Sequence, residues 1–346
     1  MNKLCKYGTH RVLSPLKALP QGADILDNTM ICQDNEILID VKTLNIDSAS
    51  FTQIKNVSNG NIEAMSEMIL SIVSMRGKMQ NPVTGSGGML LGTVKEIGSS
   101  LKKDLKIGDE IASLVSLSLT PLKIHKILQI HPEKDQVDII GEAILFETGI
   151  YAKIPSDLPS HLVLSALDVA GAPAQVNRLV KKGQSVLILG ASGKSGLLCA
   201  YQARKNTGEK GNVIGVIYDE SQLEELQRLD VCHQIIIGDA RNPMEIYEKV
   251  LQVNQNELVD ITINVVNIPN TEMTSILPTK NTGIVYFFSM ATSFTKAALG
   301  AEGIASEATM IIGNGYTENH AELTLNLLRE SPTLYDIFMK RYGKEE

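Results

Sequence analysis

Apolar residues in the second half of the chain come in six short runs, separated by segments with helical periodicity. The runs are rich in Val, Ile and Leu and rarely alternate with polar residues, which is typical of parallel strands buried on both faces. The pattern predicts a doubly wound α/β domain with a six-stranded parallel sheet from Ser185 onward. The predicted strands are 185–189, 213–217, 234–238, 259–266, 283–288 and 309–312, with helices over 221–229, 243–253, 271–277, 294–306 and 318–328.

The first half of the chain has a different pattern, with partial alternation and few helical stripes. Strands are predicted over 36–44, 89–98 and 108–114. One helix is predicted from Asn61 to Met75, because Met65, Ile69 and Ile72 recur on one helix face. This half is therefore expected to be antiparallel β structure with few helices.

Three glycines, Gly190, Gly193 and Gly196, follow the strand over 185–189, and an apolar helix-forming segment comes directly after them. This order of strand, tight turn and helix is typical of a dinucleotide-binding site, where the helix N-terminus faces the pyrophosphate. Ser192 takes the place of the usual middle glycine. A P-loop is excluded, because the glycine it needs five residues before Gly193 is Ile188.

The next strand also favours a cofactor site. Asp219 lies 23 residues after Gly196 (219 − 196), near the ~20 expected for an acid that binds the ribose. The alternative is a cap for the helix over 221–229. Because ligands of such sheets bind outside the carboxyl ends of the strands, the predicted cofactor residues are Gly190, Ser192, Gly193, Lys194, Ser195, Gly196, Asp219, Val265, Val266, Asn267, Ser289 and Met290. We expect NAD, with NADP as the alternative, since a carboxylate suits a free 2′-hydroxyl.

The patterns divide the chain into a substrate domain over 1–164, a dinucleotide-binding domain over 165–316 and a C-terminal helical segment over 317–346. A net charge of −7 without any Lys/Arg block argues against a nucleic-acid partner. No apolar run reaches about 18 residues, so no membrane span is expected. No signal peptide is apparent and the four cysteines form no C-x-x-C, so we expect reduced thiols in a cytoplasmic protein.

Several segments resemble the medium-chain dehydrogenase superfamily. They are EILIDVK (36–42), LGTVKEIG (91–98), KIGDEI (106–111) and KGQSVLILG (182–190), the last leading into the nucleotide domain. The resemblance covers most of the chain except residues 1–30 and 115–150. It implies a GroES-like β-rich domain in front of a Rossmann sheet, and a homo-oligomer, most simply a dimer.

The chain departs from the zinc pattern of that superfamily. Asp47 stands where a cysteine ligand is usual, Gly88 and Met89 replace a His-Glu pair, and only Asp168 offers a ligand at the third position. Catalytic zinc needs about three N, S or O ligands, so we expect no metal. His125 and His131 have no acidic partner at ligand spacing and are interpreted as surface residues.

Three unusual segments resemble the family of L-erythro-3,5-diaminohexanoate dehydrogenases. They are GTHRVLSP (8–15), RGKMQNPVTGSGGML (76–90) and MIIGNGY (310–316). Chain length, motif order and the missing zinc ligands agree with this resemblance. It implies oxidative deamination of (3S,5S)-3,5-diaminohexanoate at C3 in lysine fermentation, with 5-amino-3-oxohexanoate, ammonia and NAD(P)H as products.

That reaction needs a base, because the amine must be neutral before hydride leaves, and carboxylates for the substrate's ammonium groups. Asp47 and Asp168 occupy metal-ligand positions of the superfamily and are the catalytic candidates. A cap or turn role within 47–50 is the equal alternative for Asp47. Asp168 lies in the apolar run 162–174, where a buried carboxylate needs a partner.

The glycine-rich loop from Thr84 to Gly88 is predicted to hold the substrate carboxylate through backbone N–H groups, with Arg76 adding charge. An ordinary turn beside a solvated arginine is the alternative. Glu142 is a third acidic candidate, with a solvated strand position as its alternative. The predicted substrate-binding residues are Arg76, Ser86, Gly87, Gly88 and Glu142.

Two other functions stay open on the sequence. One is a zinc-free quinone or enoyl reductase, which needs a largely apolar pocket rather than several carboxylates. The other is a redox-sensing NAD(P)-binding protein without turnover, which keeps the glycine turn and needs no base.

Overall fold

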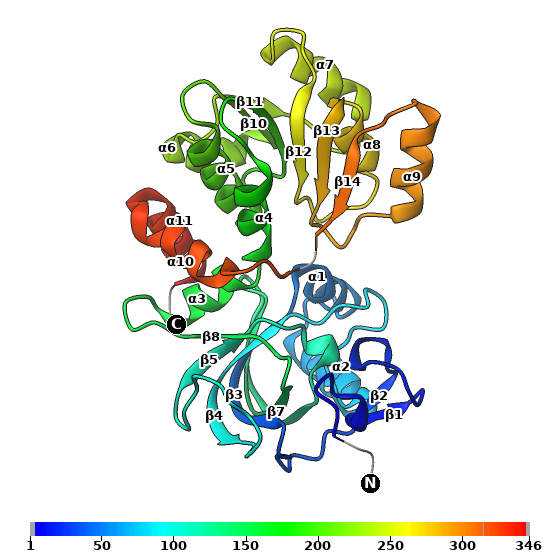
Figure 1. The fold of residues 1–346 in the computed structure, drawn as a ribbon, viewed down its shortest axis with the longest axis vertical. Coiled ribbons are helices and arrows are strands. Elements are labelled where there is room, and N and C mark those ends of the chain that lie inside the picture. The colour runs from blue at the N-terminus through cyan, green and yellow to red at the C-terminus, as the bar shows by residue number, and fades with distance from the viewer. Residues whose placement is uncertain (1–3, 314, 344–346) are drawn as a thin grey trace. The chain divides into compact units, whose positions relative to one another are not determined.

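The computed structural model describes residues 4–313 and 315–343, which fold into two compact units (Figure 1). Of the described residues, the first unit comprises 4–168 and 341–343, and the second comprises those between Val169 and Lys340. The division lies four residues (168 − 164) after the expected boundary. Residues 317–340, expected as a separate segment, belong to the second unit, where α10 (His320–Glu330) packs on α4 (Gly171–Leu179) and α5 (Lys194–Thr207).

The first unit is built on a six-stranded antiparallel sheet, which confirms the β-rich first half. Its strand order is β6-β7-β3-β4-β5-β8, and β1 and β2 pair separately. The hairpin of β6 and β7 was not predicted, because half of the residues of β6 are solvent-exposed and interrupt the apolar pattern. The strands are β1 (Val12–Ser14), β2 (Ile25–Leu26), β3 (Glu36–Asn45), β4 (Met89–Ile97), β5 (Glu110–Ser113), β6 (Leu122–His131), β7 (Gln136–Phe146) and β8 (Tyr151–Lys153).

Two helices pack against this sheet and close its core. The predicted helix is confirmed as α2 (Ile62–Arg76), and it buries Met65, Ile69 and Ile72. The preceding α1 (Ser48–Val57), which was not predicted, adds Phe51 and Ile54 to the same core. The remaining helical segments of this unit are α3 (Ser160–Leu167), η1 (Thr9–Arg11), η2 (Pro20–Gly22) and η3 (Leu117–Leu119).

The surface placement of His131 was wrong. His131 is 7% exposed, and its Nε2 lies 2.8 Å from Oδ2 of Asp138. Asp138 comes seven residues later in the sequence. The hairpin, which was not predicted, folds β7 back beside β6 and places the Asp138 carboxylate next to the His131 ring. His125 is exposed as expected and contacts Glu142 at 3.0 Å.

The second unit contains the six predicted parallel strands, in the order β11-β10-β9-β12-β13-β14. In Figure 1, α7 (Pro243–Val253), α8 (Glu272–Ile276) and α9 (Phe294–Gly303) cover one face, and α4 and α5 cover the other. The doubly wound sheet is thus confirmed. Its strands are β9 (Ser185–Leu189), β10 (Asn212–Ile217), β11 (Gln234–Ile237), β12 (Val259–Asn264), β13 (Thr279–Phe287) and β14 (Thr309–Ile312), and its other helices are η4 (Glu220–Gln222), α6 (Leu223–Leu229) and α11 (Pro332–Tyr342).

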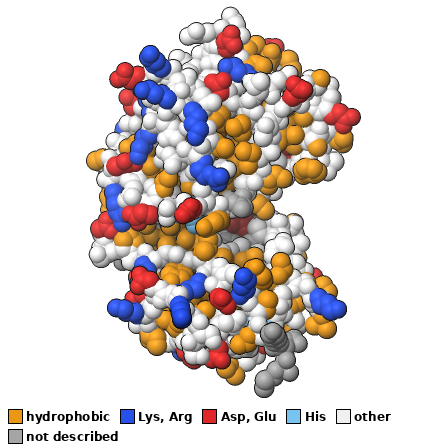
Figure 2. Space-filling view, viewed as in Figure 1, with side chains coloured by type: hydrophobic (Ala, Val, Ile, Leu, Met, Phe, Trp, Pro, Cys, Tyr) orange, Lys and Arg blue, Asp and Glu red, His pale blue; other side chains and the backbone are white. Residues whose placement is uncertain are grey.

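The helices that the structure describes are short. The longest, α2, has 15 residues, and none is long and apolar enough to span a bilayer, which takes about 20 residues. On the face seen in Figure 2, basic and acidic side chains are interspersed.

A buried ion pair fastens the N-terminal segment to the first sheet. Arg11 is 1% and Glu36 0% exposed, and Nη2 of Arg11 donates to Oε2 of Glu36 at 2.6 Å. Other Arg11 N–H groups donate to the carbonyls of Thr29 (2.5 Å) and Ile31 (2.7 Å). Burial by itself raises the pKa of the Glu36 carboxyl, but hydrogen bonds from His10 and Arg11 outweigh it and bring the pKa to about 2.

Replacing Glu36 by Gln should therefore destabilise the protein strongly. The change leaves the Arg11 guanidinium buried without its counter-charge, which costs about 3–5 kcal/mol. The pKa of Glu36 lies below its ordinary value of 4.5, so its stabilisation is complete above about pH 4.5 and is lost as the pH falls toward 2. Urea unfolding at several pH values should show that acid-dependent loss in the wild type and a smaller one in Glu36→Gln.

The matched control is Glu142→Gln on β7. Glu142 contacts Lys95 (2.9 Å), whose side chain is 45% exposed, and such exposed pairs contribute about 0–1 kcal/mol. Equal losses of stability in the two variants would contradict a special role for the Arg11–Glu36 pair.

Candidate functional site

The glycine turn of the second unit joins β9 to α5. The N–H groups of Gly190 and Ala191 both donate to the carbonyl of Val216 in β10 at 3.0 Å, which bends the chain sharply after β9. A Cβ on Gly196 would lie 2.0 Å from the carbonyl oxygen of Gly190, so only glycine lets α5 start this close to the strand. The N-terminus of a helix in this position is a typical binding place for an anion.

Ser192 has a function that the usual middle glycine could not supply. Its hydroxyl donates to Oε1 of Gln222 at 2.9 Å, and the same oxygen accepts the N–H of Tyr218 at 3.0 Å. Gln222 therefore ties the glycine turn to the end of β10. Sequence reasoning missed Gln222, because one glutamine in a polar segment carries no recognisable motif.

The ends of β12 and β13 meet the same turn. Val266 lies beside Gly190, and its N–H donates to the side-chain oxygen of Asn264 at 3.1 Å. The backbone carbonyl of Asn264 accepts the N–H of Ser289. The structure thus brings the predicted residues Val265, Val266 and Ser289 to the edge where Gly190 lies, while Asn267 and Met290 are exposed on the adjoining loops.

Asp219 lies two residues beyond β10 and caps η4. Its Oδ1 accepts hydrogen bonds from the N–H (2.9 Å) and hydroxyl groups of Ser221. The cap interpretation is therefore confirmed. Oδ2 takes no part in these cap contacts, so the ribose role stays a prediction.

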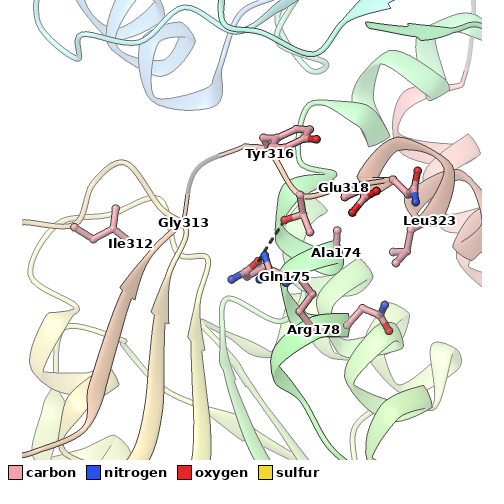
Figure 3. Close-up of a pocket in the computed structure, with 11 residues that line it drawn as sticks. Ala174, Gln175, Arg178, Ile312, Gly313, Tyr316, Glu318 and Leu323 are labelled. Carbon is pink, nitrogen blue, oxygen red and sulfur yellow. Dashed lines mark hydrogen bonds between the residues drawn. The ribbon is translucent and has the colours of Figure 1, made fainter. Parts of the chain in front are cut away.

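A further pocket of about 770 Å³ opens in the second unit (Figure 3). Its walls are α4, with Gln175 and Arg178, the end of β14 at Gly313, and the segment from Tyr316 to Asn319. The hydroxyl of Thr317 donates to Oε1 of Gln175 at 3.3 Å. The pocket lies at the carboxyl-end edge of the sheet. None of its residues was predicted to bind a ligand, because isolated amide and hydroxyl side chains form no recognisable motif.

The first unit contains a compact group of oxygens at the start of α1, which we name the hydroxyl cluster: Asp47, Ser50, Thr84 and Ser86. Asp47 caps α1, because its Oδ1 accepts the N–H groups of Ala49 (3.1 Å) and Ser50 (3.2 Å). Its Oδ2 accepts the hydroxyl of Ser50 at 2.8 Å. The cap interpretation is confirmed, and both carboxylate oxygens of Asp47 are engaged.

The glycine-rich loop is held against this cluster. The hydroxyl oxygen of Ser50 lies 2.6 Å from that of Thr84 and 2.8 Å from that of Ser86. Gly88 has a φ of 103°, and a Cβ there would lie 1.9 Å from the carbonyl oxygen of Asn45. A histidine therefore cannot replace Gly88 without moving the loop, so this chain cannot rebuild the zinc corner by that substitution alone.

Other predicted substrate residues do not join the cluster. Glu142 on β7 lies opposite Asp40 on β3, and Asp40 comes seven residues before Asp47. At about 3.3 Å per residue of extended chain, Glu142 therefore lies roughly 20 Å from Asp47. Its pKa is lowered, chiefly by a hydrogen bond from Lys95. Arg76 ends α2, and its buried Nε has no hydrogen-bond partner among the described residues.

Asp168 directly follows α3, and its N–H donates to Leu164 at 3.1 Å. The part of the chain that the structure describes contains no group of three or more His, Cys, Asp or Glu side chains arranged to hold a metal ion. Whether the protein is metal-free stays a prediction.

Comparison with known proteins identifies the family of this chain. A sequence profile of the L-erythro-3,5-diaminohexanoate dehydrogenase N-terminal domain matches residues 10–155. The L-erythro-3,5-diaminohexanoate dehydrogenase of Fusobacterium nucleatum is 58% identical, covering 99% of this chain and 100% of its own. That of Acetoanaerobium sticklandii is 57% identical, covering 98% and 99%.

Among solved structures, a quinone oxidoreductase from Coxiella burnetii has the same fold, with a TM-score of 0.55 and 20% identity over 86% of this chain and 80% of that one. This likeness confirms the expected combination of a β-rich domain and a Rossmann sheet. The near full-length identities are far more specific. By these identities, the chain belongs to the L-erythro-3,5-diaminohexanoate dehydrogenase family.

Proposed function

We propose that this protein oxidises (3S,5S)-3,5-diaminohexanoate at C3, releasing ammonia and 5-amino-3-oxohexanoate. The observation that carries the proposal is the 58% identity, along the whole chain, with a relative that bears the name of this activity. The Asp47 carboxylate and the neighbouring hydroxyl groups of the cluster add support, because the ammonium groups of a diamine substrate need anionic and hydrogen-bond-accepting partners. A place in lysine fermentation follows from the same proposal.

A nicotinamide dinucleotide is the cofactor that the second unit fits. The Gly190 turn and the N-terminus of α5 suit a pyrophosphate, and Gly196 allows the close packing of helix on strand that such a turn requires. When bound, the cofactor supplies the acceptor for the hydride. We infer NAD rather than NADP, because the Asp219 carboxylate suits a free ribose hydroxyl and repels a 2′-phosphate.

We assign proton removal from the substrate to Asp168. The oxygens of Asp47 accept three hydrogen bonds, from Ala49 and Ser50, which leaves that carboxylate poorly placed to take a proton directly from an amine. The carboxylate chemistry of the first unit also favours an amine substrate over the alkene or quinone of a reductase. A non-catalytic redox sensor would require neither carboxylate.

The remaining expectations stay predictions. The four cysteines are free thiols in the structure, and we infer a cytoplasmic enzyme that works as a homo-oligomer on a small diamino acid, without nucleic acid or membrane. Metal analysis of the purified protein checks the expected absence of zinc.

The activity is tested by following absorbance at 340 nm (the reduced nicotinamide band) with the diamine and each cofactor. We expect reduction of NAD, faster than that of NADP, and a rate that rises with pH. The rise follows because an alkyl ammonium has a pKa near 10 and an aspartate near 4, so a carboxylate is a weak acceptor at neutral pH. No reduction with either cofactor, at any pH, would contradict the proposal.

The cofactor turn is tested with Gly193→Val. A Cβ on Gly193 meets only the carbonyl oxygen of Gly190 at 3.4 Å, an ordinary contact, so the fold should survive. The branched side chain nevertheless fills the space at the start of α5, and NAD affinity measured by fluorescence titration should collapse. Gly196→Ala is the contrast, because its clash with backbone should lower the melting temperature. Unchanged NAD binding in Gly193→Val would mean that the cofactor binds elsewhere.

The base is tested with Asp168→Asn. Loss of a general base typically lowers kcat about 10²- to 10⁴-fold, and NAD affinity should not change. The control is Asp104→Asn, whose side chain is 97% exposed in the first unit. Equal kcat values in Asp168→Asn and the wild type would remove Asp168 from the mechanism.

A further inference from the structure

The hydroxyl cluster has a fixed hydrogen-bond polarity. A carboxylate only accepts hydrogen bonds, so the single proton of the Ser50 hydroxyl points at Asp47 (2.8 Å). Ser50 must then act as the acceptor in its contact with Ser86 (2.8 Å), and Thr84 donates either to Ser50 (2.6 Å) or to Ser86 (3.1 Å). All three hydroxyl protons are then used inside the cluster, and the Thr84 oxygen also accepts the Ser86 N–H at 3.4 Å, so Thr84 and Ser86 can offer a ligand only their remaining lone pairs.

A neighbouring side chain independently presents the same polarity. Gln80 is 8% exposed, and its Nε2 donates to the carbonyl of Gly85 at 3.2 Å, within the same loop. Its Oε1 is buried and has no hydrogen-bond partner among the described residues. A buried acceptor without a partner is costly. Two groups at this loop therefore have acceptor oxygens without a donor: the hydroxyl pair of Thr84 and Ser86, and the amide of the adjoining Gln80.

The outward groups of the cluster are accessible. Thr84 and Ser86 are half-buried, and Gly85 between them is exposed. A ligand group that satisfies their lone pairs must bring N–H donors, and the negative charge of Asp47 behind them favours a cation. A carboxylate would meet the lone pairs of both hydroxyl groups and the charge of Asp47 here, so these side chains favour a cation where the sequence predicted the substrate carboxylate.

We propose that Thr84 and Ser86 bind the ammonium group at C5 of the substrate, the one that does not react. This inference rests on the proposed function and adds the residues that select a diamino acid over a monoamino acid. The reacting amine at C3 must lose its proton before hydride leaves, and a cluster that ends in a carboxylate stabilises the protonated amine. The cluster therefore suits the amine that stays charged throughout the reaction.

The test compares two substrates that share the reacting amine, 3,5-diaminohexanoate and 3-aminohexanoate. Thr84→Val and Ser86→Ala each remove one hydroxyl oxygen that would accept from the ligand, with little change in the shape of the side chain. For the diamine we expect KM to rise about 10- to 100-fold in each variant, the range for a hydrogen bond to a charged group, with kcat little changed. For 3-aminohexanoate, KM should stay at the wild-type value.

The control is Thr43→Val, because the Thr43 hydroxyl also lies in the first unit and donates to a carboxylate, Oδ1 of Asp138 at 2.7 Å, outside the cluster and the loop. It should leave both KM values unchanged. A wild-type kcat for 3-aminohexanoate verifies that the first unit of each variant is folded, and an unchanged NAD affinity shows that the second unit is unaffected. A KM that rises equally for both substrates, or for neither, overturns the ammonium site. Failure of the wild type to oxidise the diamine with either cofactor contradicts the proposed function itself.

Discussion

The buried pair of Arg11 and Glu36 is the constraint on which the first unit depends. Because Arg11 also binds the carbonyls of Thr29 and Ile31, the pair fixes both ends of an N-terminal segment whose own core is small, built from Val12, Ala23 and Leu26. That segment then supports the candidate site. Nζ of Lys78 donates to the carbonyl of Pro20 at 2.7 Å, and Nε2 of Gln80 lies 3.5 Å from that of Gln21. Lys78 is fully buried, and burial, with help from Arg76, lowers its pKa to about 8. The glycine-rich loop begins four residues after Gln80 (84 − 80), so the Arg11–Glu36 pair supports this loop through the N-terminal segment.

The second unit relies on backbone geometry rather than on charge. Gly196 permits α5 to start against the end of β9, and Gln222 joins that turn to the end of β10 through Ser192 and Tyr218. The side chain and backbone of Asn264 connect the ends of β12 and β13. Rigid links of this kind let the carboxyl-end edge of a parallel sheet keep its shape, which a cofactor cradle requires.

The candidate substrate residues illustrate how one side chain can have two roles. Asp47 stabilises α1 as its cap and also sets the proton order of Ser50, Thr84 and Ser86. An N-cap is worth about 1 kcal/mol, so the structural role does not by itself require the hydroxyl groups around it. Their arrangement around a carboxylate makes the outward face of the cluster an acceptor surface, and that property comes from the cluster rather than from any single residue.

The sequence by itself determined the parallel sheet, the helix α2 and the glycine turn, because local periodicity and glycine spacing report directly on burial and on tight turns. It also indicated the family, through long segments whose residues need no tertiary context. It did not reveal the hairpin of β6 and β7, whose solvent-exposed side chains break the apolar pattern, and so it misplaced His131. Only the tertiary structure brought Ser50 to Thr84 and Ser86, 34 and 36 residues away, and separated Glu142 from Asp47. Hydrogen-bond polarity is a property of groups that meet in space, and no spacing along the chain encodes it.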